Sequence, residues 1–210
     1  MAKKQSSEQK SGYQDYILNI IKTKPDFDVS KKLLIDGIKK FMPEYNPTSL
    51  KSIDFDRTLI EFENWLVQTI TNDPIPSSVK SIWIGLNDNS KDETVSLPEI
   101  QLQIVGSKFL PDNKPEDWFK NDLWDATGKN SEIKAFKTIS NTIKNYLDLQ
   151  PLILNYLMMT LTVILAQNGF DIIKHEFLIY QKSLVVGCGF ENGERYIIGK
   201  LTEDGIDPIN

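Results

Sequence analysis

The strongest constraint in this sequence is an almost wholly apolar segment from Leu152 to Ala166, LILNYLMMTLTVILA. As a helix, these 15 residues would extend about 22 Å, less than the roughly 30 Å hydrocarbon core of a membrane. Three polar residues also interrupt the run: Asn155, Thr160 and Thr162. We therefore predict a helix that is buried on nearly all sides in a protein core, opened by Pro151 and ended by Asn168-Gly169. No membrane partner is expected.

The rest of the chain is long enough to bury such a helix. It has 210 residues, of which 40% are hydrophobic and 25% charged, as in ordinary globular domains. The single cysteine, Cys188, has no intramolecular disulfide partner, which fits a reducing compartment. Residues 1–12 lack the apolar stretch of a signal peptide. We expect a cytoplasmic protein in which residues 1–12 form a disordered tail.

Residues 13–76 are predicted to be helical. Apolar residues recur at helical spacing over 13–23, 30–42 and 56–71, and prolines separate these segments. Ser30 is the expected N-cap of the second helix. Residues 77–210 are predicted to form an α+β domain that makes one compact unit with 13–76.

The pattern changes to strands after residue 78. Apolar and other residues alternate over 79–86 and again over 97–105, and their short connection predicts antiparallel pairing. Ser131 is the expected N-cap of an amphipathic helix over 131–147. This helix and the apolar helix would form a buried pair.

A second hairpin is predicted near the C-terminus, with strands 176–190 and 195–201 around an Asn192-Gly193 turn. The turn sets the expected register: Leu184 faces Leu201, Val186 faces Gly199, Cys188 faces Ile197 and Gly189 faces Tyr196. One face of this hairpin would then join the core through Leu184, Val186, Cys188, Ile197 and Leu201. The predicted fold class is α+β, with an antiparallel sheet of two hairpins packed against the buried helix pair and an N-terminal helical segment.

No catalytic, cofactor or metal motif is recognisable. His175 is the only histidine and lies far in sequence from Cys188, so neither a zinc site nor a nucleophilic pair is predicted. Gly187-Cys188-Gly189 falls within a predicted strand and is not followed by a helix, unlike a phosphate-binding loop. We expect a non-enzymatic protein without a cofactor. The alternative is a small hydrolase or transferase with a carboxylate-based site, which would show as a pocket containing His175 or clustered carboxylates.

Negative charge is concentrated in one part of the chain. Residues 87–125 contain nine acidic residues and four lysines, an excess that equals the net charge of -5 of the whole chain. From this charge we expect no nucleic-acid partner, whereas a basic protein partner fits it. Aromatic and acidic residues meet in segment 106–125, and these are the candidate binding residues: Trp118, Phe119, Trp124, Asp112, Glu116, Asp117, Asp122 and Asp125. The alternative is a long loop that its aromatic residues attach to the core.

Two stretches resemble a family of bacterial proteins. The first is Val105-Gly106-Ser107-Lys108-Phe109 with Asp112 and Trp118, and the second runs from Val185 through Gly187-Cys188-Gly189 to Ile198-Gly199. They resemble uncharacterised proteins that are encoded beside polymorphic or contact-dependent toxins and are suspected of being immunity proteins. The resemblance covers roughly residues 80–201 and brings no catalytic residue with it. It implies binding to a cognate toxin, while pairing of sheet edges in a homodimer is a further alternative.

Overall fold

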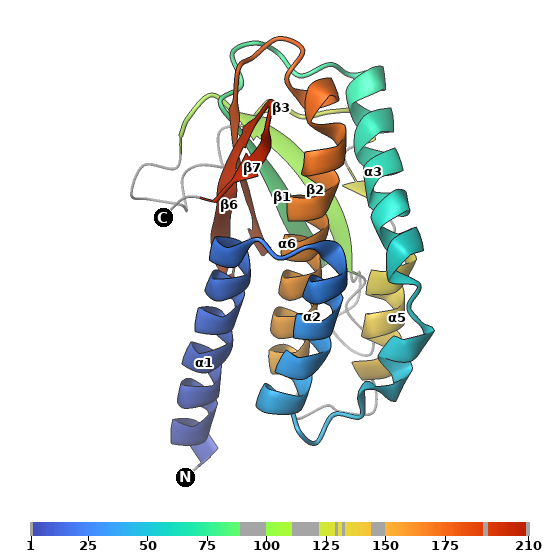
Figure 1. Cartoon of the computed structure of the whole chain (residues 1–210), viewed down its shortest axis with the longest axis vertical. Helices are drawn as coiled ribbons and strands as arrows, with labels where there is room; N and C mark the ends of the chain where they lie inside the picture. The colour runs from blue at the N-terminus through green and yellow to red at the C-terminus, as the bar shows by residue number, and fades with distance from the viewer. Residues whose placement is uncertain are drawn as a thin grey trace.

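The computed structural model describes residues 2–88, 100–110, 122–128, 130–131, 133–143, 150–190 and 193–208. The helices are α1 (Ala2–Thr23), α2 (Phe27–Phe41), the 3-10 helix η1 (Pro47–Ser52), α3 (Phe55–Asn72), α5 (Lys134–Ile143) and α6 (Gln150–Phe177). The strands are β1 (Ser81–Asp88), β2 (Ile100–Ser107), β3 (Asp122–Trp124), β4 (Asn130–Ser131), β5 (Leu184–Phe190), β6 (Arg195–Thr202) and β7 (Gly205–Asp207). Figure 1 shows the helices grouped beside a single sheet, with α6 in contact with both.

The sheet is mixed, with strand order β3-β2-β1-β5-β6-β7, and β4 also pairs with β2. β1 and β2 are antiparallel as predicted, with Ile84 opposite Ile104. β5 and β6 are antiparallel too, but a parallel pair of β1 and β5 joins the two hairpins, with Ile84 opposite Cys188. The α+β class is confirmed, and the wholly antiparallel sheet is wrong. The reason is that β5 lies beside β1, and the connection from β2 through α5 and α6 returns the chain to the end of the sheet where β1 also begins, so β5 runs in the same direction as β1.

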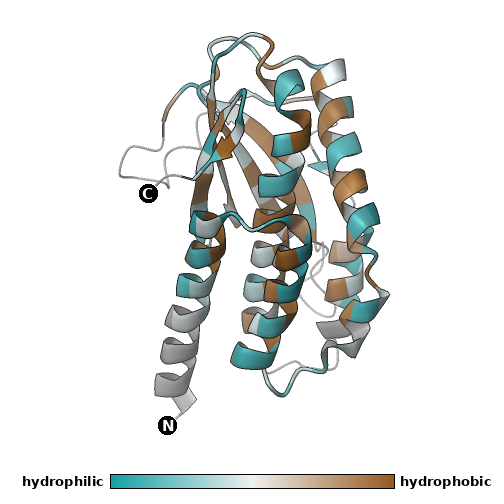
Figure 2. Cartoon of the chain, in the orientation of Figure 1, coloured by the Kyte–Doolittle hydropathy of each residue, from teal (hydrophilic) through white to brown (hydrophobic). Residues whose placement is uncertain are grey.

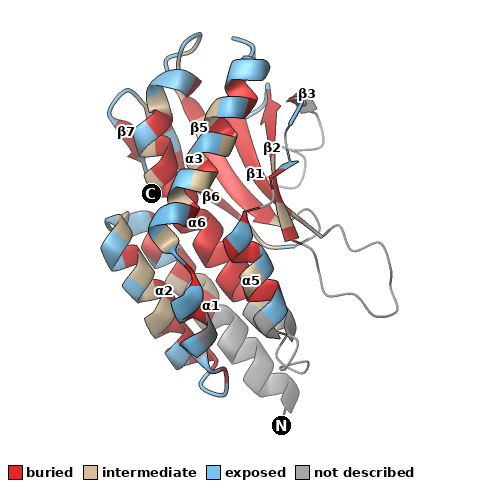
Figure 3. Cartoon of the chain, turned by 90° about the vertical axis from the view of Figure 1, so that its right-hand side faces the viewer, coloured by how far each residue is buried: buried red, intermediate tan, exposed pale blue. Residues whose placement is uncertain are grey.

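Helix α6 is the centre of the core. The side chains of Leu157 and Leu161 are fully buried and that of Ile164 is 1% exposed, as predicted. α6 contacts α1, α2, α3 and α5 as well as strands β1, β5, β6 and β7. In the part of the chain that the structure describes, it is the one helix apolar and long enough to cross a membrane, but 83% of that apolar window is buried. It is therefore part of the core, and Figures 2 and 3 show its hydrophobic and buried residues along most of its length.

α6 does not end at Asn168-Gly169 but continues to Phe177. The Asn168 side chain donates from Nδ2 to the Ile164 carbonyl at 2.9 Å, so its amide is satisfied within the helix. Gly169 lies against α3, where an added Cβ would come within 2.8 Å of the Phe62 ring. The glycine that looked like a helix end therefore permits close packing of two helices.

The N-terminal helices exist as predicted, with different ends. Asp26 caps α2 by accepting a hydrogen bond from the Val29 N–H at 2.9 Å. Ser30 is inside the helix, where its Oγ donates to the Pro25 carbonyl at 3.1 Å, so its prediction as the N-cap is wrong. α1 begins at Ala2 and includes most of the predicted disordered tail. Residues 2–11 contain no proline or glycine and are rich in Lys, Gln and Glu, which are good helix formers.

Two further elements differ from prediction near the sheet. Ser131 does not cap a helix, because it lies in β4, where its main chain pairs with Leu102 of β2. Helix α5 begins at Lys134. The strand predicted over 176–190 is shorter in the structure. Helix α6 extends to Phe177, and β5 begins only at Leu184. Both errors arise where a helix end and a strand end are close in sequence, and local pattern does not separate them.

The predicted register of the C-terminal hairpin is correct only in part. Leu184 faces Leu201 and Val186 faces Gly199, but the register then shifts, so that Cys188 faces Tyr196 and Gly189 faces Arg195. This β-bulge places Tyr196 and Ile198 in the main core. Ile197, predicted to face that core, instead joins Trp83, Val105 and Val185 in a small separate cluster.

We predict that Leu161→Ala lowers the free energy of unfolding by about 2–5 kcal/mol, because the tightly packed surroundings of α6 leave a cavity. Chemical denaturation monitored by circular dichroism measures this change. Ile60→Ala, at a side chain that is 55% exposed on α3, is the control and should change stability by less than about 0.5 kcal/mol. Equal stability of the two variants would contradict the central position of α6.

Candidate functional site

One end of the sheet gathers segments that are distant in the sequence. Ser81, at the start of β1, lies opposite Ser107 at the end of β2 and beside Val185 near the start of β5. The Lys80 N–H donates to the Ser107 carbonyl at 2.8 Å, and the Val185 N–H donates to the Lys80 carbonyl at 3.0 Å. The connections from α3 to β1 and from α6 to β5 therefore meet at the upper end of the molecule in Figure 1.

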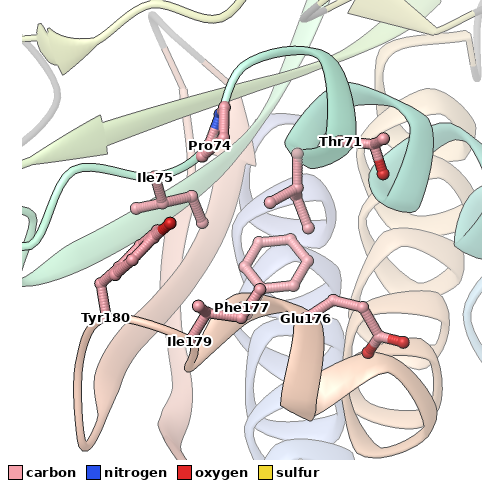
Figure 4. Close-up of a pocket in the computed structure, with 8 residues that line it drawn as sticks. Thr71, Pro74, Ile75, Glu176, Phe177, Ile179 and Tyr180 are labelled. Carbon is pink, nitrogen blue, oxygen red and sulfur yellow. The ribbon is translucent and has the colours of Figure 1, made fainter.

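An open apolar pocket lies at this end, with a volume of about 270 Å³. It is lined by the ends of α3 and α6 and by the connections that follow them: Ile70, Thr71, Pro74, Ile75, Glu176, Phe177, Ile179 and Tyr180. Figure 4 shows the Phe177 ring in the middle of these side chains, Tyr180 beside Ile75, and the Glu176 carboxylate directed away from them. Phe177 is buried, whereas Ile179 is 65% and Tyr180 62% exposed. The pocket thus has a fixed apolar floor and two apolar side chains at its rim.

Two more exposed apolar side chains follow β2 at the same end of the sheet. Phe109 is 46% and Leu110 50% exposed. The Ser81 hydroxyl donates to the Phe109 carbonyl at 2.6 Å, which fixes this turn beside the start of β1. We call the pocket together with Phe109 and Leu110 the sheet-end surface. It holds four of the eight large hydrophobic side chains that are exposed in the described part of the chain.

The structure gives Trp124 a place in the core. The side chain is 3% exposed, and its Nε1–H donates to the Asp73 carbonyl at 3.1 Å. Trp124 also pairs with Gly106 in the sheet, where its side chain occupies the space that a Cβ of Gly106 would need. Because a buried indole does not reach a partner's surface, this position favours the alternative in which the segment is attached to the core by its aromatic residues.

The structure describes two of the other predicted binding residues of segment 106–125. Asp122 lies in β3, and Asp125 is exposed just after it. The remaining five candidates lie outside the described residues: Asp112, Glu116, Asp117, Trp118 and Phe119. Their contribution to a binding surface stays a prediction.

The nucleophilic pair that the sequence argument rejected is separated in the fold. Cys188 is fully buried beside Met159, with 3.9 Å between the two sulfur atoms, and this burial raises the pKa of the thiol. His175 is exposed near the end of α6 and does not line the pocket. Within the described ranges, no group of three His, Cys, Asp or Glu side chains could hold a metal ion. Gly187-Cys188-Gly189 lies in β5 as predicted.

A polar cluster joins α1 to the C-terminal hairpin. The Tyr13 hydroxyl and the Gln14 amide both donate to Oε1 of Glu194, and the Tyr196 hydroxyl donates to Oε2 at 3.2 Å. Burial raises the pKa of both tyrosines well above the ordinary value, and the Glu194 carboxylate adds to the effect. With Tyr13 buried, the cluster is suited to holding α1 in place.

The sequence argument missed the sheet-end surface. Residues 176–183 were predicted to begin a strand, which hid the exposed Ile179-Tyr180 pair in an expected hairpin. The available signal was Phe177-Leu178-Ile179-Tyr180, an apolar run without strict alternation at the end of a helix. Only the packing of α3 against α6 turns two of these side chains outward beside Ile75.

We predict that Trp124→Ala lowers the free energy of unfolding by about 3–5 kcal/mol, because it removes a buried ring and leaves a cavity. Thermal and chemical unfolding measure this loss. Ile60→Ala, at the exposed position on α3, is again the control and should change stability by less than about 0.5 kcal/mol. A Trp124→Ala variant as stable as the wild type would show that the ring is not part of the core.

We also predict a loss of stability at high pH that depends on Tyr13. Above the ordinary tyrosine pKa of about 10, the unfolded chain releases hydroxyl protons that the folded chain keeps, so the free energy of unfolding falls as the pH rises. Tyr13→Phe should flatten this fall between about pH 10 and 12. Ile60→Ala, at an exposed side chain without a titratable group, is the control and should leave the slope as in the wild type. Urea unfolding at a series of pH values gives both slopes.

Comparisons with known proteins were made at three levels. No protein-family model matches the chain, and searches of curated proteins and of solved structures found no match.

Proposed function

We propose that the protein acts by stoichiometric binding of another protein, and that the sheet-end surface is where the partner docks. The observation that carries this proposal is an apolar pocket with exposed Ile179 and Tyr180 at its rim, with Phe109 and Leu110 exposed at the same end of the sheet. Exposed apolar side chains occur singly on most monomers, whereas a group of them beside a pocket is typical of an interaction site. Burial of such side chains supplies most of the free energy of binding at protein interfaces.

The pocket suits an anchoring side chain of the partner. Its floor is held by Phe177, which is 1% exposed and packs edge-on against Phe170 with 4.7 Å between ring centroids. A rigid floor lowers the entropy that is lost when a partner inserts a side chain. Tyr180 at the rim combines a large apolar ring with a hydroxyl, a combination that is enriched among residues critical for binding.

The partner that fits the sequence best is a basic protein, and we propose a cognate toxin. Segment 106–125 starts beside the sheet-end surface, because Phe109 and Leu110 belong to its first residues. Its acidic residues would attract a basic partner and raise the association rate. The resemblance to suspected immunity proteins supports the same role, in which binding alone neutralises the toxin.

The test is an affinity measurement on single variants. Proteins captured from the source cell, or the toxin domain encoded by a neighbouring gene, provide the ligand for titration calorimetry. Tyr180→Ala and Ile179→Ala should each weaken binding by about 2 kcal/mol, roughly thirtyfold, if they are central anchors. Higher salt should slow association more than it speeds dissociation.

Two controls separate binding from folding. Ile60→Ala removes an equally exposed apolar side chain from α3, away from the pocket, and should bind like the wild type. Trp118→Ala tests the predicted acidic and aromatic segment separately. A partner that binds Tyr180→Ala and Ile179→Ala with unchanged affinity would exclude the sheet-end surface as its docking site.

A further inference from the structure

The outer edge of the sheet at β7 has a defined place for one more strand. A two-residue turn, Glu203-Asp204, connects β6 to β7, with Thr202 opposite Gly205 and Leu201 opposite Ile206. In such a hairpin the pair beside the turn exchanges hydrogen bonds, and the next pair does not. The N–H and C=O of Ile206 therefore point away from β6, toward the position of an added strand.

Two side chains from distant parts of the sequence occupy that position. The Ile206 N–H donates to Asp171 Oδ1 on α6 at 2.7 Å. Lys24, which follows α1, donates from Nζ to the Ile206 carbonyl at 2.6 Å. Lys24 and Asp171 also form an ion pair, with 2.7 Å between Nζ and Oδ2. The Asp171 carboxylate and the Lys24 ammonium group thus take the places of the main-chain acceptor and donor that a neighbouring strand would supply.

The backbone on both sides is shaped for this contact. Lys24 has φ 40°, a left-handed conformation that residues other than glycine seldom adopt, and its N–H still donates to the Ile20 carbonyl at 3.0 Å. Gly205 has φ 113°, and a Cβ there would collide with the Asp171 carboxylate. Strained residues persist where surrounding contacts determine them. Here the hydrogen bonds and ion pair of Lys24 are such contacts.

We propose that Lys24 and Asp171 form an edge lock, which keeps β7 from pairing with β7 of a second copy of this chain. Exposed strand edges pair readily with other strands, and native proteins protect them with charged side chains, short strands or covering elements. Two β7 edges could pair antiparallel about a twofold axis, because such an interface is self-complementary. Both edge strands, β7 and β3, are only three residues long, and at β7 the Lys24–Asp171 pair adds to this protection. The lock favours a monomer and leaves the sheet-end surface for binding a different protein.

The experiment removes the lock and measures self-association by analytical ultracentrifugation. Lys24→Ala/Asp171→Ala should dimerise about tenfold or more tightly than the wild type. The matched control is Lys39→Ala/Asp36→Ala, which deletes an exposed ion pair with the same change in charge. Asp171→Asn keeps an acceptor for the Ile206 N–H and should stay as monomeric as the wild type. A folded double variant that associates no more than the control would overturn the proposal.

A second measurement applies even if the double variant does not fold. Amide hydrogen exchange on the wild-type protein reports directly on Ile206. We expect its N–H to exchange about a hundredfold or more slowly than an unprotected amide, although it points away from β6. Rapid exchange at Ile206 would show that Asp171 does not hold it, and the edge lock would then be rejected.

Discussion

Burial of α6 is the constraint on which the rest of this structure depends. An apolar helix has no face to present to water, so each side of it has to be covered by another element. The sheet covers one side through β1, β5, β6 and β7, and α1, α2, α3 and α5 pack against the remaining surface. The parallel pairing of β1 with β5 follows from the same requirement, because the chain passes through α6 before it returns to the sheet.

Polar contacts fix the outer elements to this apolar centre. Gln167 of α6 donates from Nε2 to the Ile21 carbonyl of α1 at 2.9 Å, deep in the core. Asp171, one turn further along α6, bonds both Lys24 and the edge strand β7. Glu194, just before β6, accepts a hydrogen bond from the Tyr13 hydroxyl of α1. These contacts have direction, which apolar packing lacks, and they set the position of α1 along the sheet.

The proposed binding function rests on the side chains that this packing leaves exposed. Covering α6 consumes most of the large apolar side chains, yet Phe109, Leu110, Ile179 and Tyr180 remain at one end of the sheet. The proposed edge lock at β7 and the open apolar pocket are compatible with one another, since the first would discourage self-pairing and the second would accept a different protein. Because Trp124 is buried, this surface is a better candidate for a binding site than the Trp124 side chain of segment 106–125.

The sequence by itself determined the α+β class, the buried helix and the pairing of 79–86 with 97–105, because these depend on periodicity within short segments. It also identified Leu184, Val186 and Cys188 as core residues. Only the tertiary structure decided the parallel β1–β5 contact, the bulge that places Ile198 in the core, and the end of α6. The pocket and the Lys24–Asp171–Ile206 contact could not be predicted from the sequence either, since each joins residues far apart in the chain. Local patterns record which face of a segment is apolar, whereas packing between segments decides which side chains finally meet.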